Sequence, residues 1–151
     1  MTKKTGRHTL KSSPLLMAVE LGDVAAAVRA LDAGEAVDVL DLDGNTPLTR
    51  AAFLGNIPLM QVLLDRGANP DAVNDIGWSP LHFAAQENRP DAAGLLIARR
   101  ATIEPRDPNG NTPLWTAAFN ESAEVVDLLV RHGASLTTAN KHGVTPQELL
   151  D

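Results

Sequence analysis

The sequence predicts an all-α solenoid in which helix-turn-helix units stack on one another and β-hairpin loops project from the stack. Three observations support this fold class. A Ser/Thr-Pro dipeptide recurs at a constant step of 33 residues, a glycine precedes it by two residues in four of its five copies, and paired alanines follow it in three. A period of this length is the signature of a repeat protein. The dipeptides begin at Ser13, Thr46, Ser79, Thr112 and Thr145.

The first helix of each unit is expected to begin at this dipeptide. A Ser or Thr hydroxyl accepts hydrogen bonds from the free amides that open a helix, and proline at the first helical position loses no bond. The paired alanines, such as Ala51 and Ala52, keep this helix thin enough for close packing. An apolar run such as residues 57–64 predicts the second helix. The second helices are expected to end at glycines in the left-handed conformation, namely Gly34, Gly67 and Gly133.

The segments between units are predicted to form projecting loops. Their Asp/Asn-x-x-Gly pattern predicts a turn whose glycine adopts a positive φ. In the third unit Arg100 stands where the other units end a helix with glycine. A left-handed arginine costs about 1 kcal/mol, so we expect strain or a rearranged loop there. Lys11 stands where the first unit would have its turn glycine, so no hairpin is expected before the first helix.

The repeat also sets the domain organisation. Residues 1–11 are expected to form a loose basic tail, and residues 12–151 a single repeat domain. Gln147 and Glu148 replace residues that face the core in other units, as a cap that faces water requires. The units are expected at approximately 12–40, 41–73, 74–106 and 107–139, with a C-terminal cap at 140–151.

At these residues the sequence resembles the ankyrin repeat, whose pattern reads Asp-x-x-Gly-x-Thr-Pro-Leu-His-x-Ala-Ala, then Gly, an apolar helix and Gly-Ala-Asp. The resemblance covers nearly the whole chain and is best over residues 41–69 and 107–135. Thr49 and Trp115 replace the histidine of the pattern, so the hydrogen bond of that histidine is expected to be missing twice. The resemblance implies a rigid protein-binding scaffold without catalytic chemistry.

The resemblance further implies that the hairpin tips and the exposed sides of the first helices form a concave binding face. Three of the five aromatic residues fall on this face, and tryptophan is enriched among residues that dominate interface energy. We therefore expect Trp78 to be the principal contact, with little role in the fold. The expected contacts are apolar anchors at Trp78, Phe53, Leu54, Ile76 and Phe119, acidic residues Asp43, Asp75 and Glu87 that steer a basic partner, and the amides Asn45 and Asn111. The alternative for Phe53 and Phe119 is that they support neighbouring hairpins.

Composition narrows the class of partner. The chain has 151 residues, no cysteine and a formal charge of -6. The first eleven residues carry four basic residues and no acid, so the remaining 9 basic and 19 acidic residues give the body -10. Such a surface repels a phosphate backbone, so nucleic acid is not expected. No run of eighteen apolar residues predicts a membrane span, and we expect a cytoplasmic protein that is a monomer when free.

Motifs for catalysis and metal binding are missing from the sequence. It contains no Gly-x-Ser-x-Gly, P-loop or His-Glu-x-x-His pattern, and His82, His132 and His142 fall at different places in the unit. No cofactor, metal or enzymatic activity is expected. The function expected is protein binding, in its narrowest form a bacterial immunity protein that occludes a toxin, as small ankyrin-like proteins can be. The alternatives are a self-associating scaffold and a small metal-dependent hydrolase.

Overall fold

The computed structural model describes residues 6–151, and within them the predicted all-α solenoid is confirmed. Nine α-helices, one short 3-10 helix and two short strands occur in this part of the chain. The elements are β1 (Arg7–His8), η1 (Leu10–Ser12), α1 (Pro14–Leu21), α2 (Val24–Asp32), β2 (Leu40–Asp41), α3 (Pro47–Leu54), α4 (Ile57–Asp65), α5 (Pro80–Gln86), α6 (Pro90–Ala98), α7 (Pro113–Phe119), α8 (Ala123–Arg131) and α9 (Pro146–Leu150).

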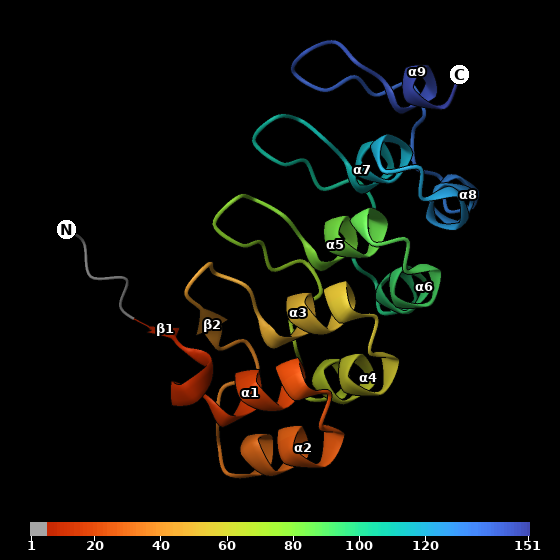
Figure 1. Cartoon of the computed structure of the whole chain (residues 1–151). Coiled ribbons are helices and arrows are strands. Elements are labelled where there is room, and N and C mark those ends of the chain that lie inside the picture. Colours follow the sequence, from red (N-terminus) through yellow and green to blue (C-terminus); the bar gives the residue numbers. More distant parts are fainter. Residues whose placement is uncertain (1–5) are drawn as a thin grey trace, which may run out of the picture.

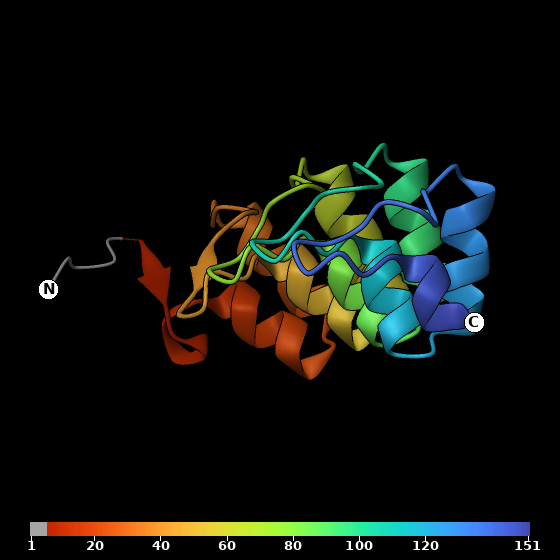
Figure 2. The same cartoon turned by 90° about the horizontal axis from the view of Figure 1, so that it is seen from above.

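The helices form two layers, and the loops project beyond one of them (Figure 1). The layer next to the loops contains α1, α3, α5, α7 and α9, here called the inner helices. The other layer contains α2, α4, α6 and α8, the outer helices. From α1 to α7, each inner helix packs on the next inner helix and on the outer helix that follows it. Seen from above, the loops follow one another along a single side of the stack (Figure 2).

The predicted beginnings and ends of the helices are confirmed. The five dipeptide hydroxyls, from Ser13 to Thr145, each accept a hydrogen bond from the amide three residues later, with proline at the first helical position. The glycines expected after the outer helices have positive φ, for example 86° at Gly67. Arg100 also has a positive φ, 65°, so it adopts the left-handed conformation itself. The backbone strain expected at this residue is therefore present.

The core repeats with the same step as the sequence. Leu15, Leu48, Leu81 and Leu114 are fully buried at equivalent places in the inner helices. The alanine pairs are buried as well, so inner and outer helices approach closely. Leu59, Leu63, Leu96 and Leu129 fill the space from the outer helices. Every unit thus buries its apolar residues both between its own two helices and against its neighbours.

Each projecting loop is held by the side chain of its first residue. In the loop 41–45, Asp41 Oδ1 accepts from the amides of Asp43 and Asn45 at 2.9 and 2.8 Å. The backbone closes the same loop through a bond from Asp41 N to Asn45 O. The loops 74–78, 107–111 and 140–144 repeat this arrangement. The positions of the loop tips are therefore fixed by local hydrogen bonds.

Backbone hydrogen bonds also connect successive loops, with one interruption. The amide of Asp75 donates to Asp43 O at 3.0 Å, and the amide of Lys141 donates to Asn109 O at 2.9 Å. The residue that would donate between the loops 74–78 and 107–111 is Pro108, which has no N–H. The backbone connection is consequently missing between the third and fourth units.

The N-terminal segment differs from the expectation of a loose tail over residues 1–11. Arg7–His8 pair with Leu40–Asp41 as a parallel two-stranded sheet, and η1 follows directly. The expectation is wrong for this part of the segment, because backbone pairing with a loop holds it. Residues 1–5 lie outside the described residues.

Candidate protein-binding face

The exposed sides of the inner helices and the loop tips form one continuous surface, here called the inner face. A chain of contacts runs along it from α1 to the loop 74–78. Arg50 pairs with Glu20 at 2.6 Å and lies over the Phe53 ring at 5.5 Å. Phe53 meets Phe83 edge to face at 6.0 Å, and Phe83 meets Trp78 in the same way at 5.1 Å. These contacts link three units and pre-order the side chains of the face.

Phe119 is the most open aromatic side chain of the inner face. It is 62% exposed, and its ring stacks on Trp115 with centroids 5.2 Å apart and an interplanar angle of 11°. The predicted missing bond at Trp115 is confirmed, since the buried Trp115 Nε1 has no hydrogen-bond partner. One face of the Phe119 ring is therefore supported and the other is open. A rigid, half-covered ring suits an interface anchor because little side-chain entropy is lost on binding.

Trp78 lies in the scaffold, contrary to the expectation of a free contact. Its side chain is half-buried, stacks on His82 at 5.7 Å, and donates from Nε1 to Asp107 Oδ2 at 3.1 Å. Asp107 belongs to the next unit, so this bond joins two units. The expectation that Trp78 has little role in the fold is wrong.

The two predicted amide contacts are also structural. Asn45 is 7% exposed; its amide donates to Asp41 Oδ2 at 3.0 Å, and its oxygen accepts from Asn74 Nδ2 at 2.9 Å. Asn111 accepts in the same way from Asn140 Nδ2 at 2.9 Å. The prediction of Asn45 as an exposed contact is wrong because its polar atoms are used between loops. The recurrence of Asn at Asn45 and Asn111, one place before the dipeptide, is the signal that could have shown this.

The apolar anchors predicted at the loop tips and helix ends lie at different depths. Ile76 is 58% exposed at the tip of the loop 74–78, and Leu42 is similarly open at the tip of the preceding loop. Leu54, at the end of α3, is half-buried. Ile76 and Phe119 are therefore the predicted anchors with the most free apolar surface.

The predicted acidic residues are not equally available. Asp43 is exposed at a loop tip, and Glu87 is half-buried at the end of α5. Asp75 instead forms an ion pair with Arg7 at 2.7 Å. Part of the negative charge expected to steer a basic partner is thus neutralised by the chain's own N-terminal segment.

A hollow of about 280 Å³ lies at the N-terminal end of the inner face. Its charged lining residues are Glu20, Asp41, Asp43 and Arg50, and Thr9 and Leu10 of the N-terminal segment also line it. Sequence reasoning missed this hollow because the pairing of β1 with β2 has no local signature.

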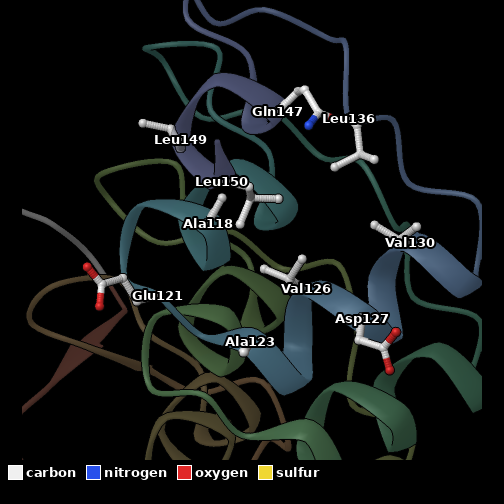
Figure 3. Close-up of a pocket in the computed structure, with 10 residues that line it drawn as sticks. All are labelled: Ala118, Glu121, Ala123, Val126, Asp127, Val130, Leu136, Gln147, Leu149 and Leu150. Atoms are coloured by element: carbon white, nitrogen blue, oxygen red, sulfur yellow. The ribbon is translucent and has the colours of Figure 1, made fainter.

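A larger apolar hollow, of about 620 Å³, lies between α8 and α9 at the other end of the stack (Figure 3). Val126 and Val130 of α8 face Leu150 of α9 across it, and Leu136 lines it from the connecting segment. Val130 and Leu150 are both exposed. No loop-tip residue and none of the predicted anchors lines this hollow.

His82 is a structural residue. It is fully buried, its Nδ1 accepts from the amide of Ser79 at 3.2 Å, and its Nε2 donates to Asn111 O at 3.0 Å. Burial lowers the pKa of His82, although the Asn111 carbonyl and the Asp107 charge act to raise it. Among the described residues no group of three or more His, Asp or Glu side chains is placed to hold a metal ion. No helix of this part of the chain is long and apolar enough to cross a membrane.

Family models cover most of the sequence. A model of ankyrin repeats in three copies matches residues 15–107, and a model of a single ankyrin repeat matches residues 109–141. The chain therefore belongs to the ankyrin-repeat family. A search among curated proteins finds no match. Ankyrin repeats are generally protein-protein interaction modules and are typically non-catalytic.

Proposed function

We propose that this protein binds one protein partner through its inner face and blocks a surface that the partner needs. The observation that supports this proposal most strongly is Phe119, an aromatic ring that is 62% exposed and rests on Trp115. Exposed apolar groups that are held rigidly are typical of interface anchors. Ile76, Leu42 and the partly covered Phe53 extend the apolar surface toward the N-terminal units.

The charge of the face favours a basic partner. Asp43 and Glu87 border the apolar residues, and the chain as a whole carries -6. Acidic residues at the rim of an interface mainly raise the association rate with a basic protein. The narrower role that we propose is that of a bacterial immunity protein, which occludes the active surface of a toxin in the cytoplasm. The absence of cysteine is compatible with that reducing compartment.

The test compares capture of proteins from the native lysate by wild type, Phe119→Ala and Val130→Asp. Phe119→Ala is expected to lose the specific partner, with an affinity loss of roughly tenfold or more. Val130→Asp, on outer helix α8, is expected to retain it because this residue lies off the inner face. Circular dichroism and unfolding curves must show that both variants are folded. Equal capture by wild type and Phe119→Ala would refute the proposal.

The hollow between α8 and α9 favours self-association as a second candidate function. Val130 and Leu150 expose apolar surface there, and two copies could cover it. Light scattering over a hundredfold range of concentration distinguishes this candidate from the first. A mass that rises in wild type but not in Val130→Asp would support self-association through this hollow, and a constant monomer mass would exclude it.

A further inference from the structure

The guanidinium of Arg7 is held between two loops. Its Nη2 pairs with Asp75 Oδ1 at 2.7 Å, and its Nη1 donates to Asp41 O at 3.4 Å. The Arg7 side chain is 19% exposed. A planar group with several donors is thus bound by a carboxylate and a carbonyl from different units, an arrangement that suits the guanidinium of arginine better than the ammonium of lysine. We call the site formed by Asp41 O, Gly44 and Asp75 the arginine cradle.

Gly44 provides the space for this guanidinium. A Cβ at Gly44 would lie 2.3 Å from Arg7 Nη1 and 2.6 Å from Asp75 Oδ1, so a larger residue would force both of these side chains to move. Gly143 stands at the equivalent place in the loop 140–144 with almost the same φ, 78° against 80°. Nothing lies within 4 Å of a Cβ at Gly143. The turn requires glycine in both loops, but only Gly44 also opens a binding site.

The backbone next to Arg7 is bound in the manner of an added strand. Arg7 and His8 pair in parallel register with Leu40 and Asp41. Thr9 and Leu10 then lie against the hollow that contains Glu20 and Arg50. An extended peptide that adds to a strand edge gains affinity from main-chain bonds and specificity from side-chain sites. Both elements are present here, with the chain's own segment as the occupant.

We infer that the arginine cradle is a recognition site for an arginine-bearing extended segment, and that Arg7 and β1 occupy it in competition with that segment of the partner. The inference rests on the proposed function, since it places one contact of the basic partner on the inner face. Asp75 was predicted to meet a basic partner, and its carboxylate is already bound to a cation of the same chemistry. The partner gains this contact only by displacing Arg7.

Competition from Arg7 and β1 weakens the binding of the partner's segment to the arginine cradle without abolishing it. A tethered segment acts at an effective concentration on the order of millimolar, which a partner in trans must overcome. The side chains of Arg7 and Asp75 remain partly exposed to solvent, which screens their attraction. The ion pair is therefore of modest strength, and the exchange is reversible. Release of β1 is therefore expected to strengthen the binding of any arginine-bearing segment.

The experiment is an NMR titration of the full chain with a synthetic peptide of residues 6–12. In the Arg7→Glu variant, Asp75 repels the introduced carboxylate, so the side chain of residue 7 no longer occupies the cradle. The peptide is expected to shift the amide signals of residues 40–44 and of Asp75, at a concentration at least about tenfold lower than wild type requires. A peptide that carries Ala or Lys in place of Arg is expected to produce little shift.

The matched control adds Gly44→Ala or Gly143→Ala to Arg7→Glu. Both changes place a side chain at a positive φ, but only Gly44→Ala fills the cradle. Peptide binding is expected to be lost in the first and kept in the second. Equal binding by the Arg and Ala peptides, by wild type and Arg7→Glu, or by the two glycine variants would overturn the inference. The titration does not involve the partner, so its failure leaves the test of Phe119 unaffected.

Discussion

The indole of Trp78 donates to the carboxylate of Asp107 over 3.1 Å and so joins the third unit to the fourth. At the equivalent places Asn45 accepts from Asn74, and Asn111 accepts from Asn140, each at 2.9 Å. The direction of the bond is reversed only at Trp78, because the residue opposite is an aspartate, which cannot donate. The residue types on the two sides of each junction are therefore complementary.

This complementarity predicts the effect of Asp107→Asn. One oxygen of the side chain must still accept from the backbone amides of Asn109 and Asn111, so the new amide group would face the Trp78 N–H and also Asn111 Nδ2, which donates to the same oxygen at 3.3 Å. Two opposed donors leave a partly buried group unpaired, and we expect a loss of about 1–3 kcal/mol in the free energy of unfolding. Urea denaturation measures this loss.

The control for Asp107→Asn is the same change in a Trp78→Asn background. The introduced amide at position 78 can present its oxygen to the new donor, as Asn45 does to Asn74. Asp107→Asn is then expected to cost less than it does in the wild-type background, because only Asn111 Nδ2 remains opposed to the new amide group. Equal costs in the two backgrounds would contradict a direct coupling between these side chains.

The two tryptophans are expected to respond differently to the same substitution. Trp78→Phe removes a hydrogen bond to a charged acceptor, so a loss of about 1–3 kcal/mol is expected. Trp115→Phe removes a buried donor that has no partner, so the change is expected to be neutral or stabilising. Guanidinium unfolding midpoints of the two variants test this difference. A larger loss from Trp115→Phe would contradict it.

The different outcomes at these residues show what the repeat pattern could predict. The step of 33 residues placed the helix starts, the turn glycines and the strained Arg100 correctly, because each depends on local chemistry that recurs in every unit. The pattern could not tell an exposed aromatic from one bonded to the next unit. Trp78 and Phe119 both stand at variable positions of the unit, yet only Phe119 is open. The pairing of Arg7 with Leu40 keeps the step of 33 residues, but it was missed because Lys11 stands where the other loops have their turn glycine.

Arg100→Gly is expected to stabilise the protein by about 1 kcal/mol. Arg100 has a φ of 65°, and glycine adopts this conformation without steric cost, as Gly67 does at the equivalent place. Thermal unfolding measures the gain. Asn88→Gly serves as a control, since Asn88 is also left-handed but its side chain contacts Glu124 and accepts from the amide of Val125 at 3.4 Å. Its replacement is expected to give no gain, and a gain of similar size there would argue against strain as the cause at Arg100.

The stability of the fold is expected to fall on acidification through the titration of His82. Burial lowers the pKa of His82 below its ordinary value of 6.5 in the folded chain. The unfolded chain therefore binds the proton first, and stability is lost as the pH falls from about 6.5 toward the lower folded pKa. The slope from one such group cannot exceed about 1.4 kcal/mol per pH unit. Urea unfolding at a series of pH values measures it.

The matched variant for this pH dependence is His82→Thr, because Thr49 occupies the same place in the second unit with a bond to Thr46 at 3.0 Å. His8, His132 and His142 remain in both proteins, so the difference between the two profiles reports on His82. Identical slopes in wild type and His82→Thr would assign the effect to other groups.

Because of the proline in the loop 107–111, the units of the solenoid are not all connected in the same way. At this junction the backbone bond between loops is absent. The hydrogen bonds there come instead from the side chains of Trp78, to Asp107 Oδ2, and of His82, to Asn111 O. Without the backbone bond these two loops are less tightly joined than the others, so we expect their relative motion to be largest here. Ile76 belongs to the third unit and Phe119 to the fourth, so they lie on opposite sides of this junction. A partner that grips both residues would set the curvature of the whole stack.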